Sequence, residues 1–187
     1  AMDRPGIKEH MGEVRREEMA KAARALGVHH RWLGYVDSGL PDPVEGKSME
    51  ELLPEGCFAL QGDDTVAQEF VQVIREFRPH VIITYDENGG YPHPDHLMVH
   101  RASMIAWEKA GDAAYHPELG EAWTPLKLYY SHGFVYQRMK IFHDLLLEEG
   151  KTSPYGPMLA RWDTAFGDIM ARVTTQVLSL IHISEPT

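Results

Sequence analysis

Residues 84–96, in the middle of the chain, carry most of the side chains that could perform chemistry. Two histidines, two aspartates and a glutamate lie within this stretch. It follows an apolar run, 80–83, that predicts a buried strand, and it precedes residues 97–110, which predict a helix. In open α/β sheets, ligands bind at the carboxyl ends of the strands. The stretch therefore predicts a functional loop and, in particular, a metal site.

The spacing of His93 and His96 favours this interpretation. Pro94 suits the first turn of a helix, where both imidazoles could face one cavity, and Asp95 could hydrogen-bond to one ring and fix its tautomer. Histidine and carboxylate ligands that leave one position for water suit zinc-assisted hydrolysis. A purely structural role for the two histidines remains open on spacing alone. His100 could extend the ligand set, but packing within the helix is the interpretation that we favour for it.

Composition restricts the class of protein. The 187 residues carry a formal net charge of -10, which argues against a nucleic acid or an anionic membrane as partner. Cys57 is the single cysteine, so no internal disulfide can form and a reducing compartment fits. No apolar run approaches the roughly 20 residues of a membrane-spanning helix. These features predict a cytoplasmic protein without nucleic-acid or membrane partners.

Helical patterns alternate with short apolar strands, which predicts an α/β domain with a mostly parallel sheet. Residues 36–62 are rich in proline and glycine and predict a functional loop or a lid. The domain is expected to cover 1–177, whereas 178–187 look like a non-native tail, with a short strand as the alternative. The expected helices are 12–26, 63–78 (with Asp63 or Asp64 as its cap), 97–110, 135–148 and 165–173, and the expected strands are 28–35, 81–85 and 126–131.

The run Tyr85-Asp86-Glu87-Asn88-Gly89-Gly90-Tyr91-Pro92-His93-Pro94-Asp95-His96 closely resembles the second metal motif of a known family. This is the family of zinc-dependent de-N-acetylases related to N-acetylglucosaminyl-phosphatidylinositol deacetylase. Further stretches resemble the family in the same order, so that the resemblance covers about 1–177: these are 13–19, 26–27, 32–41, 53–60 and 74–80. The resemblance implies a Rossmann-like three-layer sandwich with a mostly parallel sheet.

The resemblance also implies roles for individual residues. His96 matches the histidine that ligates zinc, and His93 the histidine that stabilises the oxyanion or protonates the leaving amine. Asp95 matches the acid that orients His93, and Tyr91 a tyrosine that contacts the polarised carbonyl. Arg15 and Asp37 fall where the family binds sugar and inositol hydroxyls, although salt-bridge or loop-capping roles are equally open for these two residues.

The implied reaction is the cleavage of small molecules, mycothiol S-conjugates, to a mercapturic acid and glucosaminyl-inositol. Deacetylation of N-acetylglucosaminyl-inositol is the alternative within the same class. A non-catalytic sugar-binding domain is the alternative from another class. Met139, Phe142, Leu145 and Leu146 form a helical stripe that could mediate oligomerisation, with core packing as the simpler explanation.

One departure from the family is serious. Its first motif, His-Pro-Asp-Asp, supplies two of three zinc ligands and the general base, and this sequence does not occur in the chain. The chain is therefore expected to be a fragment that lacks the first strand, the first metal loop and the first helix. We expect such a fragment to bind zinc weakly, to be inactive by itself and to expose a sheet edge.

Overall fold

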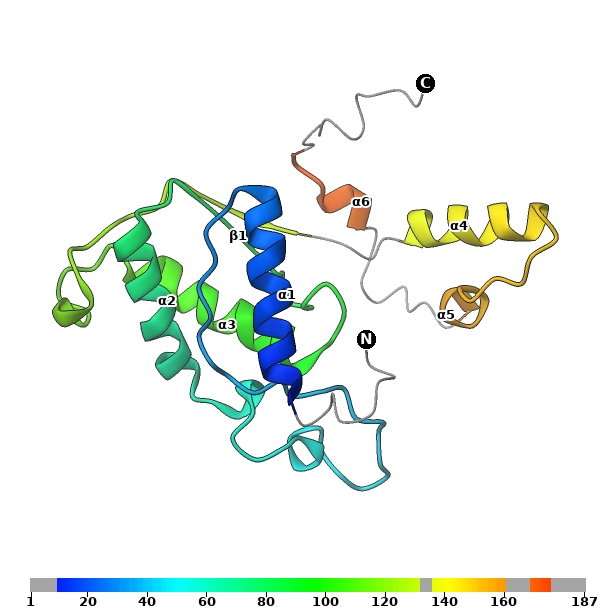
Figure 1. Ribbon diagram of the computed structural model, residues 1–187, viewed down its shortest axis with the longest axis horizontal. Helices are drawn as coiled ribbons and strands as arrows, with labels where there is room; N and C mark the ends of the chain where they lie inside the picture. Colours follow the sequence, from blue (N-terminus) through cyan, green and yellow to red (C-terminus); the bar gives the residue numbers. More distant parts are fainter. Residues whose placement is uncertain (1–9, 132–135, 161–168, 176–187) are drawn as a thin grey trace. The chain divides into compact units, whose positions relative to one another are not determined.

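The computed structural model describes residues 10–131, 136–160 and 169–175 (Figure 1). Contacts divide the chain into two units, Ala1–Tyr129 and Tyr130–Thr187. The expected single domain over 1–177 stays a prediction, and the expected tail, 178–187, lies outside the described residues.

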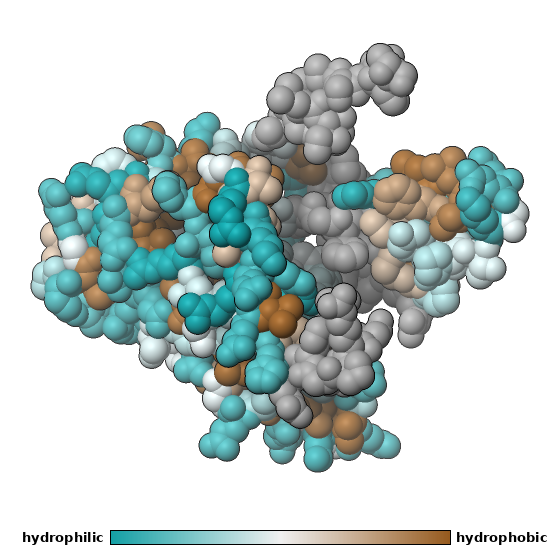
Figure 2. Space-filling model, viewed as in Figure 1, coloured by the Kyte–Doolittle hydropathy of each residue, from teal (hydrophilic) through white to brown (hydrophobic). Residues whose placement is uncertain are grey.

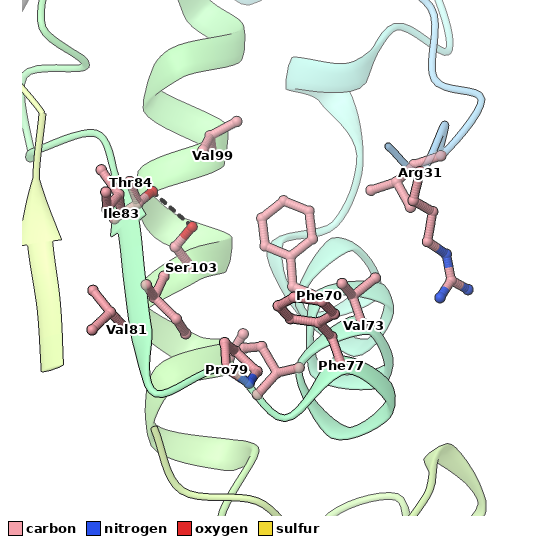
Figure 3. Close-up of a pocket in the computed structure, with 14 residues that line it drawn as sticks. Arg31, Phe70, Val73, Phe77, Pro79, Val81, Ile83, Thr84, Val99 and Ser103 are labelled. Carbon is pink, nitrogen blue, oxygen red and sulfur yellow. Dashed lines mark hydrogen bonds between the residues drawn. The ribbon is translucent and has the colours of Figure 1, made fainter. Parts of the chain in front are cut away.

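The described residues of the first unit form three long helices and a small sheet. The strands β1 and β2 pair side by side, and their arrows run in the same direction in Figure 3. The helix α3 connects them along the chain, as parallel pairing requires. This arrangement agrees with an α/β fold. The elements are α1 (Met11–Leu26), η2 (Glu50–Leu52), η3 (Phe58–Leu60), α2 (Asp63–Phe77), β1 (Val81–Thr84), α3 (Pro94–Lys109), η4 (Pro117–Leu119) and β2 (Lys127–Tyr130).

The core of this unit lies between α2 and α3, which run side by side in Figure 1. On α3, alanines at 102 and 106, continued by Ala110 just beyond the helix, form a stripe of small side chains four residues apart. Against them pack the buried α2 residues Val66, Val71 and Ile74. Small side chains let the two helix axes approach closely, so α3, which carries the candidate site at its first turn, is firmly held.

Local signals set most helix ends. Gly27, directly after the predicted helix 12–26, ends α1 in the left-handed conformation (φ 66°), which is usual for a glycine at this position. Arg78 ends α2 with φ 54°, directly before Pro79, as expected. The predicted cap of α2 was wrong: the cap is Gly62, and Asp63 already lies within the helix. The helix dipole nevertheless favours acidic residues in the first turn, which explains why Asp63 and Asp64 lie at the start of α2.

The predicted strand 28–35 is not observed. The segment runs without regular secondary structure, and among the described residues the only paired strands are β1 and β2. Apolar residues with strand character form a ladder only when another backbone supplies hydrogen-bond partners. The irregular segment 36–62 is confirmed apart from two short turns, η2 and η3.

Arg75 on α2 is the most densely bonded side chain of the described residues. It is only 4 % exposed, and its guanidinium donates to six backbone carbonyls, those of Lys109, Ala110, Asp112, Tyr115, His116 and Gly120. Two of these carbonyls belong to the C-terminal end of α3, where the helix dipole favours a cation. Arg75 thus joins the turn after α3 to the last turn of α2.

Tyr35 links the segment 28–35 to α2. Its hydroxyl donates to Glu69 Oε1 at 2.8 Å, and its ring packs on Phe58 with centroids 4.9 Å apart. Burial, followed by the hydrogen bond to the Glu69 carboxylate, raises the pKa of Tyr35 to about 12. The phenol therefore stays protonated and remains a donor throughout the neutral range.

An apolar cavity of about 450 Å³ lies beside β1 (Figure 3). Phe70 and Phe77 of α2 line one side, and Val81 and Ile83 of β1 line the other. Phe77 and Ile83 are also strongly exposed, at 68 % and 69 %. The outer edge of β1 thus presents an apolar surface that the described residues leave partly uncovered.

The second unit contains α4 (Tyr136–Glu148), α5 (Gly156–Ala160) and α6 (Ile169–Arg172). The helix predicted at 135–148 is confirmed from 136 onward, and the one predicted at 165–173 is described only from 169. On α4, Met139 is buried, whereas Phe142 and Leu145 are 39 % and 52 % exposed. Figure 2 shows apolar side chains gathered on this helix. Whether the stripe mediates oligomerisation stays a prediction.

Among the helices that the structure describes, none has both the length and the apolar character needed to cross a lipid bilayer.

Candidate metal and catalytic site

The loop between β1 and α3 is held in shape by the buried carboxylate of Asp86. This residue is 2 % exposed, and its Oδ1 accepts the backbone N–H groups of Asn88 and Gly90 at 3.2 and 3.0 Å. The side-chain amide of Asn88 donates to Oδ2 at 3.3 Å. At the base of the loop, Thr84 Oγ1 donates to Ser103 Oγ of α3 at 2.9 Å (Figure 3). Asp86 and Asn88 therefore shape the loop.

His93 is the N-cap of α3, and Pro94 follows it in the first turn, as the sequence predicted. The backbone N–H of Asp95 donates to His93 Nδ1 at 3.1 Å. A ring nitrogen that accepts a hydrogen bond carries no proton, so the neutral ring has its proton on Nε2. The backbone of Asp95, and not its carboxylate, thus fixes the tautomer. His93 presents an Nε2–H donor.

His96 has the opposite tautomer. Its Nδ1 lies 2.8 Å from the carbonyl oxygen of Gly89, and since a carbonyl can only accept, Nδ1 must carry the proton. The ring stacks on Tyr85 with centroids 4.1 Å apart and meets Tyr91 edge-on at 4.8 Å. The Nε2 lone pair is left as a potential metal ligand. A backbone carbonyl that orients a histidine in this way is a usual support for metal binding.

The carboxylate of Asp95 binds Ser38, a residue 57 positions earlier in the chain. The Ser38 N–H donates to Oδ2 at 3.1 Å, and the Ser38 hydroxyl donates to Oδ1. Nothing local in the sequence predicts a role for Ser38. The only available signal was its position beside Asp37 in one of the stretches that resemble the family.

Asp37, His93 and Asp95 come together as a cluster. Each offers one potential ligand atom, and these atoms lie within 4.8 Å of one another. By distance alone the cluster could hold a cation. However, His93 Nδ1 and both oxygens of Asp95 already accept hydrogen bonds. By contrast, Nε2 of His96 accepts no hydrogen bond from the described residues.

The remaining candidates lie apart from these contacts. Arg15 is on α1, where it donates to Glu18 Oε2 at 2.6 Å, one turn further along the same helix. This is the salt-bridge role that the sequence left open for Arg15. His100 Nδ1 lies 3.0 Å from the Tyr85 carbonyl, which fits the packed role that we favoured over metal binding.

Gly89 offers a test of the loop. An alanine Cβ there would lie 2.9 Å from His96 Cβ and 2.9 Å from the Tyr91 carbonyl oxygen, and Gly89 has φ +68°. Gly90 has a similar φ of +72°, but its Cβ would make only ordinary contacts with Tyr85. Both substitutions should cost about 1–2 kcal/mol for the left-handed backbone. We expect Gly89→Ala to cost more and to displace His96.

The measurement is urea unfolding of both variants, together with the zinc affinity of the whole protein. Gly90→Ala is the matched control, since it carries the same backbone strain without the contact. Equal losses of stability and equal zinc affinities in the two variants would contradict the expected clash.

Comparison with known proteins gives one family match and several curated relatives. Residues 2–107 match the family described as PIG-L, GlcNAc-PI de-N-acetylase. The chain is 53 % identical over 158 residues to the "Mycothiol S-conjugate amidase" of Streptomyces coelicolor, which covers 83 % of this chain and 53 % of that protein. It is 42 % identical over 130 residues to "1D-myo-inositol 2-acetamido-2-deoxy-alpha-D-glucopyranoside deacetylase 2" of Saccharopolyspora erythraea (67 % and 45 % covered).

A third relative, a deacetylase of the same name numbered 1, comes from Catenulispora acidiphila. It is 38 % identical over 176 residues, which covers 91 % of this chain and 52 % of the relative. The chain thus spans about half the length of these curated relatives. The family match extends over more than half of the chain and includes every candidate site residue. This chain belongs to the PIG-L family of GlcNAc-PI de-N-acetylases.

Proposed function

We propose that the whole protein is a zinc-dependent amide hydrolase that cleaves mycothiol S-conjugates to a mercapturic acid and glucosaminyl-inositol. The observation that carries the proposal is the 53 % identity, over 83 % of this chain, to a protein named for that reaction. The paired tautomers of His93 and His96 support it, because they put a proton donor beside a free imidazole lone pair. The two ring centroids are 5.1 Å apart.

The residues present fit a zinc ion. Among the described residues no group donates to the Nε2 lone pair of His96, its Nδ1–H donates to the Gly89 carbonyl, and Tyr85 stacks on the ring. When bound, zinc would lower the pKa of its water to about 7 and polarise the amide carbonyl. A tight zinc site needs three protein ligands, so in this proposal His96 shares the metal with further ligands of the whole protein.

In this proposal, His93 acts through its Nε2–H, which would donate to the developing oxyanion or to the leaving amine nitrogen. Tyr91 lies beside both histidines, with its ring 5.9 Å from that of His93, and would contact the polarised carbonyl. Asp37 is exposed next to His93 and Asp95, so its carboxylate could accept hydrogen bonds from sugar hydroxyls. Arg15 would need to leave Glu18 to bind the inositol group.

The finer fold assignment also belongs to this proposal. A Rossmann-like three-layer sandwich requires more strands than β1 and β2. The cavity beside β1 has apolar walls from α2 and β1, and Arg31 and Leu33 of the extended segment 28–35 also line it. A further parallel strand from the whole protein would fit between that segment and β1. It would pair the edge of β1 and cover Ile83.

Deacetylation of N-acetylglucosaminyl-inositol is the second candidate, since relatives 42 % and 38 % identical carry the name of that activity. The two reactions differ in the acyl group on the sugar nitrogen. The test incubates the whole protein with a mycothiol conjugate and, separately, with N-acetylglucosaminyl-inositol, and measures free amine before and after chelation.

The proposal predicts a higher kcat/KM for the conjugate, loss of turnover with chelator and recovery with zinc. A higher kcat/KM for the acetylated sugar would favour the second candidate. No cleavage of either amide by the zinc-loaded whole protein would exclude both.

A further inference from the structure

Ser38 links two segments that lie far apart in the sequence. It belongs to the irregular segment 36–62, yet it is only 1 % exposed. Its N–H and its hydroxyl both donate to the carboxylate of Asp95, in the first turn of α3. Since the two donors reach different oxygens, they fix the plane of the carboxylate as well as its position.

A third hydrogen bond sets the direction of the Ser38 hydroxyl. The backbone N–H of Ala59 donates to Ser38 Oγ at 3.0 Å. That contact occupies the oxygen from one side, so the hydroxyl proton turns toward Asp95. Ser38 thus connects η3 (Phe58–Leu60) to the start of α3 through hydrogen bonds.

The residue before Ser38 belongs to the same arrangement. Asp37 Oδ1 accepts the N–H of Gly39 at 2.7 Å, so its carboxylate is fixed over the turn that contains Ser38. Asp37 and Asp95 thereby both lie close to His93, within the 4.8 Å cluster. A shift of Ser38 would move both carboxylates relative to the His93 ring.

We propose that Ser38 is a positioning residue for the reaction: it holds the Asp95 carboxylate and, through Asp37, sets the substrate-facing cluster against His93. This inference rests on the proposed function. Ser38 acts through its neighbours and touches no reacting atom. The alternative is a purely structural role, in which Ser38 only stabilises the irregular segment through its hydrogen bond with the Ala59 N–H.

The experiment compares Ser38→Ala and Ser38→Cys in the whole protein, with kcat, KM and the melting temperature as readouts. Cysteine fills the same space, but its S–H is a weak donor. We expect kcat to fall about ten- to hundredfold in both variants, the range for losing a hydrogen bond to a charged group. Ser48→Ala is the matched control: Ser48 is exposed in the same segment, and its hydroxyl accepts the N–H of Glu51 at 3.4 Å.

A double-mutant cycle separates the two explanations. In an Asp95→Ala background, Ser38→Ala should lower kcat less than about threefold, because its partner is already gone. A mere fastening role predicts the same factor in both backgrounds. That result, or wild-type kcat in Ser38→Ala, or full activity in Ser38→Cys, would overturn the inference. If the unaltered whole protein cleaves neither substrate, the proposed function fails first, and the inference fails with it.

Discussion

Replacing His93 with alanine in the whole protein is expected to lower kcat by about a hundredfold to ten-thousandfold and to leave the zinc content unchanged. A fall in kcat of this size is typical when a general acid or base is removed. Zinc should stay because Nδ1 of His93 is occupied by the Asp95 N–H and Nε2 carries the proton, so the ring offers no lone pair. Turnover of the conjugate and elemental analysis check the two halves of this prediction.

The matched control is His29→Ala, which removes an exposed histidine of the same unit and should leave both values unchanged. If His93→Ala lost zinc together with activity, His93 would be a ligand. The close cluster of Asp37, His93 and Asp95 would then be the metal site in place of His96. The experiment thus decides between two arrangements that distances alone permit.

Replacing Arg75 with methionine is expected to lower the free energy of unfolding by at least about 3 kcal/mol. Six carbonyls lose a donor, and a buried acceptor left without a partner costs about 1–3 kcal/mol. Methionine fills much of the volume, so the loss reports hydrogen bonds more than packing. Urea unfolding of the chain measures the difference.

Arg101→Met is the control for Arg75. Arg101 lies on α3 and binds Asp63 at 2.9 Å, but the two side chains are 44 % and 40 % exposed to solvent, so the loss should stay below about 1 kcal/mol. Arg75→Lys should lower the free energy of unfolding by an amount between those for Arg75→Met and Arg101→Met, since an ammonium has three donors and cannot reach six carbonyls. Equal losses for Arg75→Met and Arg101→Met would contradict the role of Arg75.

The elements that local patterns encode could be predicted from the sequence. Apolar periodicity located α2 and α4, Gly27 and Arg78 marked helix ends, and the apolar run before the loop marked β1. The strand expected at 28–35 could not be decided in this way, because a strand exists only with a partner backbone. The apolar residues of 28–35 indicate a segment that could form a strand, but they do not reveal whether another backbone pairs with it.

The sequence could predict the loop that carries the candidate site, but not the contacts within it. The spacing of His93 and His96 gave the right loop and the right helix turn. Their opposite tautomers depend on two backbone groups, the Asp95 N–H and the Gly89 carbonyl, which side-chain spacing cannot reveal. The bond between Ser38 and Asp95 spans 57 residues and forms only once the irregular segment has folded.

The zinc content of the whole protein and of its His96→Ala variant, measured after dialysis against a fixed zinc concentration, tests the central claim most directly. We expect about one zinc per unaltered protein, and an affinity at least about tenfold weaker in the variant, because a direct ligand is lost. Turnover of the conjugate should fall with the zinc. Full zinc content and undiminished turnover in the variant would contradict the claim that the imidazole of His96 holds the catalytic metal.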